Sequence, residues 1–108
     1  MAHYLITASY TGASWAAQIK NPQNRLEIVR PLFEKAGGSI ESAFLSFGDS
    51  DLIVIVQFPD NVSVASVSML LAASGAVTNL KTTPLMALED GVKALKKAGS
   101  LSYSPPGS

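Results

Sequence analysis

Two aspartates in the middle of the chain have a spacing that could serve chemistry. Asp49 and Asp51 could offer carboxylate oxygens to a cation, or act together as a general acid and base. Aspartate is also favoured in tight turns, and this pair follows Gly48 directly in the turn-forming stretch 48–51. A cation site needs more carboxylates, and none stands nearby in the sequence. We therefore favour the turn and predict no metal site.

Two basic side chains could act as proton acceptors if the fold enclosed them. His3, the only histidine, could be a general base or a haem ligand. It stands at the start of a predicted strand, near a chain end that frays, so a structural role is favoured. Lys81 could be a base or a nucleophile if it faced inward. On an edge strand it would instead discourage aggregation, which we favour.

Arg25 stands where a predicted helix begins, a position that suits a bound anion. It could bind an anionic ligand there, or it could pair with Glu27, Asp49 or Asp51. We favour the ion pair, because most arginines in such positions are structural.

Tyr10 and Trp15 flank the turn Thr11-Gly12 and could form the wall of a ligand pocket. A single tryptophan in a small domain is more often a packing residue, and we favour that interpretation for Trp15. The candidate ligand pocket consists of His3, Tyr10, Trp15, Arg25 and Lys81.

The composition excludes several classes of protein. The chain has 108 residues, of which 47% are hydrophobic and 15% charged, and eight basic residues balance eight acidic ones. Disordered chains are poorer in apolar residues and richer in charge, and nucleic-acid binders carry a basic excess. With no cysteine and one histidine, the chain has no disulfide, thiolate or multi-histidine metal site. No cofactor is predicted.

The sequence also contains no membrane signal. No run of 18 apolar residues occurs, and the first residues lack the basic stretch of a secretory signal. We therefore expect a cytoplasmic protein that contacts neither membrane nor nucleic acid.

Hydrophobic periodicity and turn residues divide residues 1–98 into strands and helices of one domain. Strands are predicted over residues 3–10, 39–47, 52–58 and 76–83. Helices are predicted over residues 13–20, 22–36, 61–74 and 87–98. Pro31 is expected to kink the second helix and Pro84 to end the fourth strand. Residues 99–108 are expected to form a flexible tail that could dock on a neighbour through Tyr103.

This order of elements predicts an α+β fold of the ferredoxin-like βαββαβ type, with an antiparallel four-stranded sheet and a C-terminal helix. The helices cover one face of the sheet. Strict alternation assigns the following residues to the other face: His3, Leu5, Thr7, Ser9, Ile40, Ser42, Phe44, Ser46, Val77, Asn79, Lys81 and Thr83. Such a face could line a half-polar cavity or be an ordinary dimer interface, and we favour the interface.

The apolar content suggests how the second face is covered. The five apolar residues of stretch 52–56 indicate a strand with both faces shielded from water. Two sheets packed face to face would provide this shield and form a dimeric α/β barrel. We therefore predict a homo-oligomer, at least a dimer.

The strand–turn–strand segment Phe47-Gly48-Asp49-Ser50-Asp51-Leu52 resembles the GYD domain family. Further matching segments follow in order over about residues 2–97, and they include Gly37-Gly38, the stretch 58–61 and Thr82-Thr83-Pro84. The resemblance implies a ferredoxin-like fold related to dimeric α/β barrels, and it implies no particular activity. Ser50 stands where the family usually has a tyrosine, so any role of that tyrosine is absent. Gly48, Asp49 and Asp51 retain the rest of the motif.

Three functions are compatible with these features. The first is a homo-oligomeric module that binds a small apolar or anionic molecule, or is structural. The second is a cofactor-independent enzyme of the dimeric-barrel kind, an isomerase or a monooxygenase, which requires at least two of His3, Arg25, Asp49 and Lys81 to converge in a closed pocket. The third is an assembly subunit that binds a partner through its tail and sheet edge.

Overall fold

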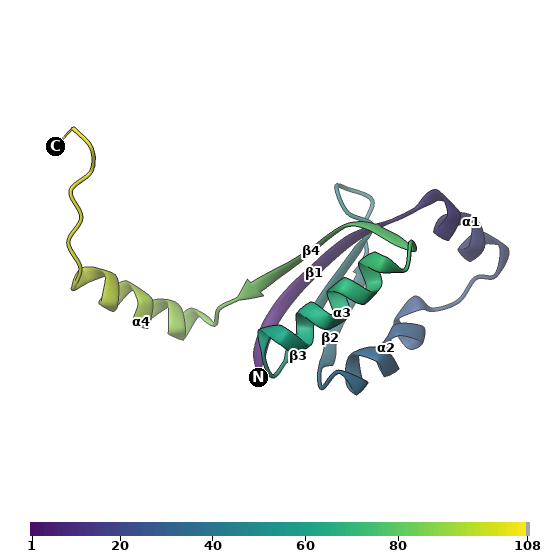
Figure 1. Cartoon of the computed structure of the whole chain (residues 1–108), viewed down its shortest axis with the longest axis horizontal. Coiled ribbons are helices and arrows are strands. Elements are labelled where there is room, and N and C mark those ends of the chain that lie inside the picture. Colours follow the sequence, from purple (N-terminus) through teal and green to yellow (C-terminus); the bar gives the residue numbers. More distant parts are fainter. Residues whose placement is uncertain (108) are drawn as a thin grey trace.

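The computed structural model describes residues 1–107, which form one antiparallel sheet in the order β2-β3-β1-β4 (Figure 1). The strands are β1 (Ala2–Tyr10), β2 (Ser39–Leu45), β3 (Leu52–Phe58) and β4 (Val77–Leu85). The helices are α1 (Gly12–Lys20), α2 (Arg25–Lys35), α3 (Asn61–Ala73) and α4 (Leu88–Gly99). The predicted α+β class with a ferredoxin-like order of elements is confirmed. No helix within residues 1–107 combines the length and apolar character needed to cross a bilayer.

Alternate residues of the central strands build the core beneath α2 and α3. Their buried side chains meet apolar residues of the two helices, and the core consists of Tyr4, Ile6, Phe33, Val54, Val56, Phe58, Val64 and Val67. The period of two in β1 and β3 therefore places one full set of side chains on the covered face. Tyr4 keeps its hydroxyl satisfied by donating to Asn61 Oδ1 at 2.5 Å.

Gly38, where the chain enters β2, lies against the most enclosed ring of the core. Phe58 has no exposed surface, and a Cβ built on Gly38 would lie 2.5 Å from its ring. Any larger residue at position 38 must therefore displace Phe58. The preceding residue, Gly37, ends α2 in the left-handed region at φ 92°.

The second helix begins later than the sequence predicted. It starts at Arg25, because the Asn24 side chain accepts a hydrogen bond from the backbone N–H of Leu26 at 3.0 Å and caps the helix. It then continues through Pro31 to Lys35.

Two irregularities in the strand pairing correct the predicted division of side chains between the sheet faces. The register shifts between Ile40 and Ser42 in β2, and between Thr7 and Ser9 of β1 where it pairs with β4. Ile40 consequently packs against the core rather than on the open face. Asn79 adopts a positive φ of 51° at the second irregularity. Val77 consequently lies opposite the buried Tyr10 and lines the covered face. An extra residue in a strand reverses the alternation that follows it.

Pro84 does not end the fourth strand, contrary to the prediction. It pairs with Tyr4, and β4 continues to Leu85. β4 is one of the two edge strands of the sheet, and an edge strand tolerates proline because only one of its sides bonds to a neighbouring strand.

The face of the sheet opposite α2 and α3 is left open and remains substantially apolar. Leu5, Ile53 and Ile55 are only half-buried there, and Phe44 is 65% exposed. Leu5 lies opposite Ile55, so these side chains form a continuous patch across the central strands.

The helix α4 projects away from the sheet beyond the end of β4 (Figure 1). None of its residues is buried, and Leu88 is 90% exposed. Residues 101–107 continue from it without regular helix or strand. Residue 108 of the predicted tail lies outside the described residues.

Candidate functional site

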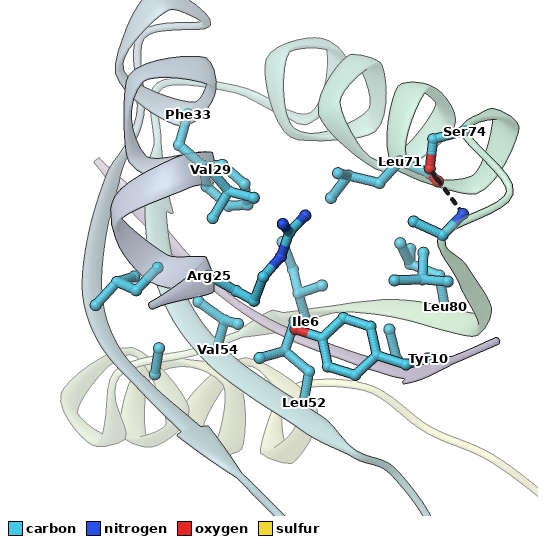
Figure 2. Close-up of a pocket in the computed structure, with 15 residues that line it drawn as sticks. Ile6, Tyr10, Arg25, Val29, Phe33, Leu52, Val54, Leu71, Ser74 and Leu80 are labelled. Atoms are coloured by element: carbon cyan, nitrogen blue, oxygen red, sulfur yellow. Dashed lines mark hydrogen bonds between the residues drawn. The ribbon is translucent and has the colours of Figure 1, made fainter. Parts of the chain in front are cut away.

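An apolar cavity of about 80 Å³ lies between α2, α3 and the covered face of the sheet (Figure 2). Its walls are aliphatic and aromatic side chains from β1, α2, β3, α3 and β4, including Ile6, Val29, Phe33, Val54 and Leu71. Periodic apolar residues in each element therefore converge on one space.

Among residues 1–107, Arg25 is the only charged side chain that lines this cavity. Its guanidinium extends toward the centre, between Tyr10 on one side and Val29 and Leu71 on the other (Figure 2). Arg25 also borders two more open hollows, of about 380 and 270 Å³, whose walls include Gln18 and Gln23. The side chain therefore stands between the apolar interior and a polar entrance.

The predicted ion pair of Arg25 is not formed. Within residues 1–107 no carboxylate lies within 4.0 Å of its guanidinium, and Glu27 instead pairs with Arg30 at 3.8 Å. Glu27, one of the three expected partners beside Asp49 and Asp51, is two residues away from Arg25, and residues at that spacing do not share a helix face.

Three residues interact with Tyr10: Asp51, Trp15 and Arg25. Its backbone N–H donates to Asp51 Oδ2 at 2.9 Å, and Trp15 packs edge-on against its ring with the centroids 5.1 Å apart. Arg25 and Asp51 both act on its phenol electrostatically. Burial raises the pKa of Tyr10 above its usual 10.0, the positive charge of Arg25 opposes this rise, and Asp51 adds to it.

The raised pKa of Tyr10 makes stability depend on alkaline pH. The unfolded phenol loses its proton first, so the stabilisation is complete below about pH 10 and is lost as pH rises through the folded pKa. We expect Tyr10→Phe to have a shallower loss of unfolding free energy between about pH 9 and 11 than the wild type. Urea titrations across this range measure it, and equal slopes for the two proteins would contradict the assignment.

The motif residues of the turn have structural contacts. Asp51 joins the ends of three segments, because it binds Tyr10 through its side chain and Ala8 and Ser46 through its backbone. Asp49 is exposed. Gly48 does not adopt the left-handed backbone region. Residues 1–107 contain no group of three or more histidine, cysteine, aspartate or glutamate side chains that could hold a metal ion.

The remaining candidates lie on the opposite side of the sheet. His3 Nε2 is 3.4 Å from Glu41 Oε1, which also accepts a hydrogen bond from Gln57. Lys81 is exposed on the edge strand, opposite Thr7. The predicted pocket is thus divided. Tyr10 and Arg25 line the cavity and Trp15 supports Tyr10, whereas His3 and Lys81 face the other way. Of His3, Arg25, Asp49 and Lys81, from which the enzyme hypothesis requires at least two, Arg25 alone lines this cavity among residues 1–107.

The sequence reasoning missed the lining of the cavity and the role of Asp51. Val29 and Phe33 stand at helical spacing within the predicted helix 22–36, a pattern that indicates packing and gives no sign of a cavity. One residue could have indicated the cavity: Arg25, a charge at the start of an otherwise apolar helix face. Leu71 is far from Arg25 in the sequence, so a local pattern does not show that the two residues lie close together.

The family model described as GYD domain matches residues 4–95, a range that includes all the residues lining the cavity, β1 from Tyr4 onward, and the other three strands. No curated protein and no solved structure matches the chain.

Proposed function

Since this chain belongs to the GYD domain family, and the family match carries no activity, we propose a function from the cavity itself: a small-molecule-binding module that takes up a small monocarboxylate. The carboxylate would contact Arg25 and the Tyr10 hydroxyl, and a short apolar chain would fill the space beyond them.

The observation that carries the proposal is Arg25 directed into an apolar space without a carboxylate partner. A charged group in apolar surroundings is costly unless an opposite charge compensates it. A guanidinium offers parallel N–H donors that fit the two oxygens of a carboxylate. A bound monocarboxylate therefore supplies the charge that the chain itself does not.

The volume limits the size of the ligand. A water-sized sphere occupies roughly 10–15 Å³, so a cavity of about 80 Å³ suits a ligand of about six non-hydrogen atoms. Isobutyrate has this size, because it consists of a carboxylate group bonded to a branched three-carbon group. Aliphatic walls favour such a chain over a polar one.

The module is proposed to be a homo-oligomer built on the open face. Leu5, Ile53 and Ile55 form an apolar patch there, and Phe44 extends it toward the edge. Packing two such faces together would produce the dimeric α/β barrel expected from the sequence and would remove this patch from water. The proposed ligand cavity is on the other face and would stay accessible in that dimer.

Calorimetric titration with three molecules of one shape tests the proposed function. We expect isobutyrate to bind at least tenfold more tightly than isobutyramide, which is neutral, and we expect no binding of the cation isobutyramidinium. The reason is that only the carboxylate compensates Arg25. Equal affinity for isobutyrate and isobutyramide would show that charge is not recognised, and the proposal would be wrong.

A further inference from the structure

The exposed stripe of α4 has the spacing of a two-stranded helix pair. Leu88, Val92, Leu95 and Gly99 are separated by four, three and four residues, which are the a and d positions of a heptad repeat. Leu95 is 74% exposed and Leu88 is 90% exposed. A helix of 12 residues is marginal in water by itself, so this stripe requires a packing partner.

The charges beside the stripe are complementary to those of a second copy. Glu89 and Lys96 occupy the same e position of successive heptads, on one flank of the stripe. Within residues 1–107 neither has an ion-pair partner within 4.0 Å, whereas Asp90 and Lys93 pair with each other at 3.5 Å. In an antiparallel pair of identical helices, e positions face e positions. Glu89 of each copy then lies opposite the partner's Lys96, so the pair has two such contacts. A parallel pair would place these e positions opposite g positions, one of which is the uncharged Gly91.

From this pattern we propose that α4 pairs antiparallel with α4 of a second copy of this chain, with Leu88 beside the partner's Gly99 and Val92 beside the partner's Leu95. Glycine at position 99 leaves room for close approach, since a Cβ there would meet nothing within 4 Å. The stripe also continues from the open face, because Leu85 lies three residues before it and is 41% exposed. The pairing names a second contact for the proposed homo-oligomer and does not depend on the proposed ligand.

Single cysteines test this arrangement well because the natural chain has none. We mix the full-length variants Leu88→Cys and Gly99→Cys in equal amounts, oxidise them in a glutathione buffer, and separate the three disulfide dimers by intact mass. In the antiparallel pair, position 88 lies beside position 99 of the partner. The two copies of position 88 are then about 16 Å apart along the axis, too far for a disulfide.

We expect the mixed 88–99 dimer to form well over half of the disulfide product, since random collision gives half. A share of half or less, or no disulfide beyond that of the urea-unfolded mixture, would overturn the pairing. Isobutyrate titration of the same unmodified chain distinguishes this failure from that of the ligand proposal.

Charge variants give the matched control. Adding Glu89→Lys to both cysteine chains places lysine opposite lysine and should reduce the share of the mixed dimer. Adding Lys96→Glu as well restores complementarity and should restore that share. If the double reversal fails to recover it, the predicted contact between Glu89 and the partner's Lys96 is wrong.

Discussion

Replacing Gly38 with alanine should lower the free energy of unfolding by about 3 kcal/mol, although it adds a single methyl group. That methyl would lie 2.5 Å from the ring of Phe58, which is fully buried and cannot move aside without disturbing the core. Urea denaturation of the wild type and of Gly38→Ala measures the difference. Gly12→Ala is the matched control, because a Cβ there meets nothing within 4 Å. It should leave stability unchanged or raise it by a few tenths of a kcal/mol, as alanine favours the helix.

A second substitution identifies the cause. Phe58→Leu removes the ring atoms that the added methyl meets, so the two changes should be less damaging together than their sum. We expect a favourable coupling of about 1–2 kcal/mol in the double-mutant cycle of Gly38→Ala with Phe58→Leu. Strict additivity would show that the contact between position 38 and the ring is not what limits the glycine.

The largest effect on binding is expected from Arg25. Arg25→Gln keeps a polar side chain but removes the charge, and it should weaken isobutyrate binding by about 30- to 150-fold, corresponding to about 2–3 kcal/mol. The affinity of Arg25→Lys for isobutyrate should lie between those of the wild type and Arg25→Gln, because an ammonium keeps the charge but not the parallel donors. Calorimetric dissociation constants provide the comparison.

Arg30→Gln serves as the control for Arg25. Arg30 is on the same helix, α2, but it pairs with Glu27 and does not line the cavity. Its replacement should leave the dissociation constant for isobutyrate within about twofold of the wild type, since a surface ion pair contributes little. Equal weakening by both substitutions would mean that the ligand responds to the net charge of α2 and not to the cavity.

Local sequence patterns located the four helices and the four strands, and they predicted the alternation of buried side chains within β1. They were insufficient where pairing between strands intervenes. The irregularities at Ile40 and Asn79 depend on the neighbouring strand, so Ile40 and Val77 were assigned to the wrong face. Pro84 was taken as the end of a strand because its position at the sheet edge is a property of the whole topology.

For the candidate site too, local patterns identified individual residues but not the contacts between distant segments. Arg25 and Tyr10 were recognised by residue type and by their place next to turns. Their common cavity depends on contacts among α2, α3 and the sheet, which a local pattern does not encode. For α4, the sequence predicted a helix over residues 87–98, and the structure has it at Leu88–Gly99. That the helix leaves the sheet is set by the direction in which β4 ends.

The most direct test of the central claim is to locate isobutyrate in the wild-type protein by NMR, with the isoleucine methyl groups labelled. Ile6 lines the cavity, whereas Ile53 and Ile55 lie on the open face of the sheet. Bound isobutyrate should give intermolecular nuclear Overhauser effects to the Ile6 methyl group and none to Ile53 or Ile55. Effects to Ile53 and Ile55 without Ile6 would place the ligand on the open face and contradict a binding site at Arg25.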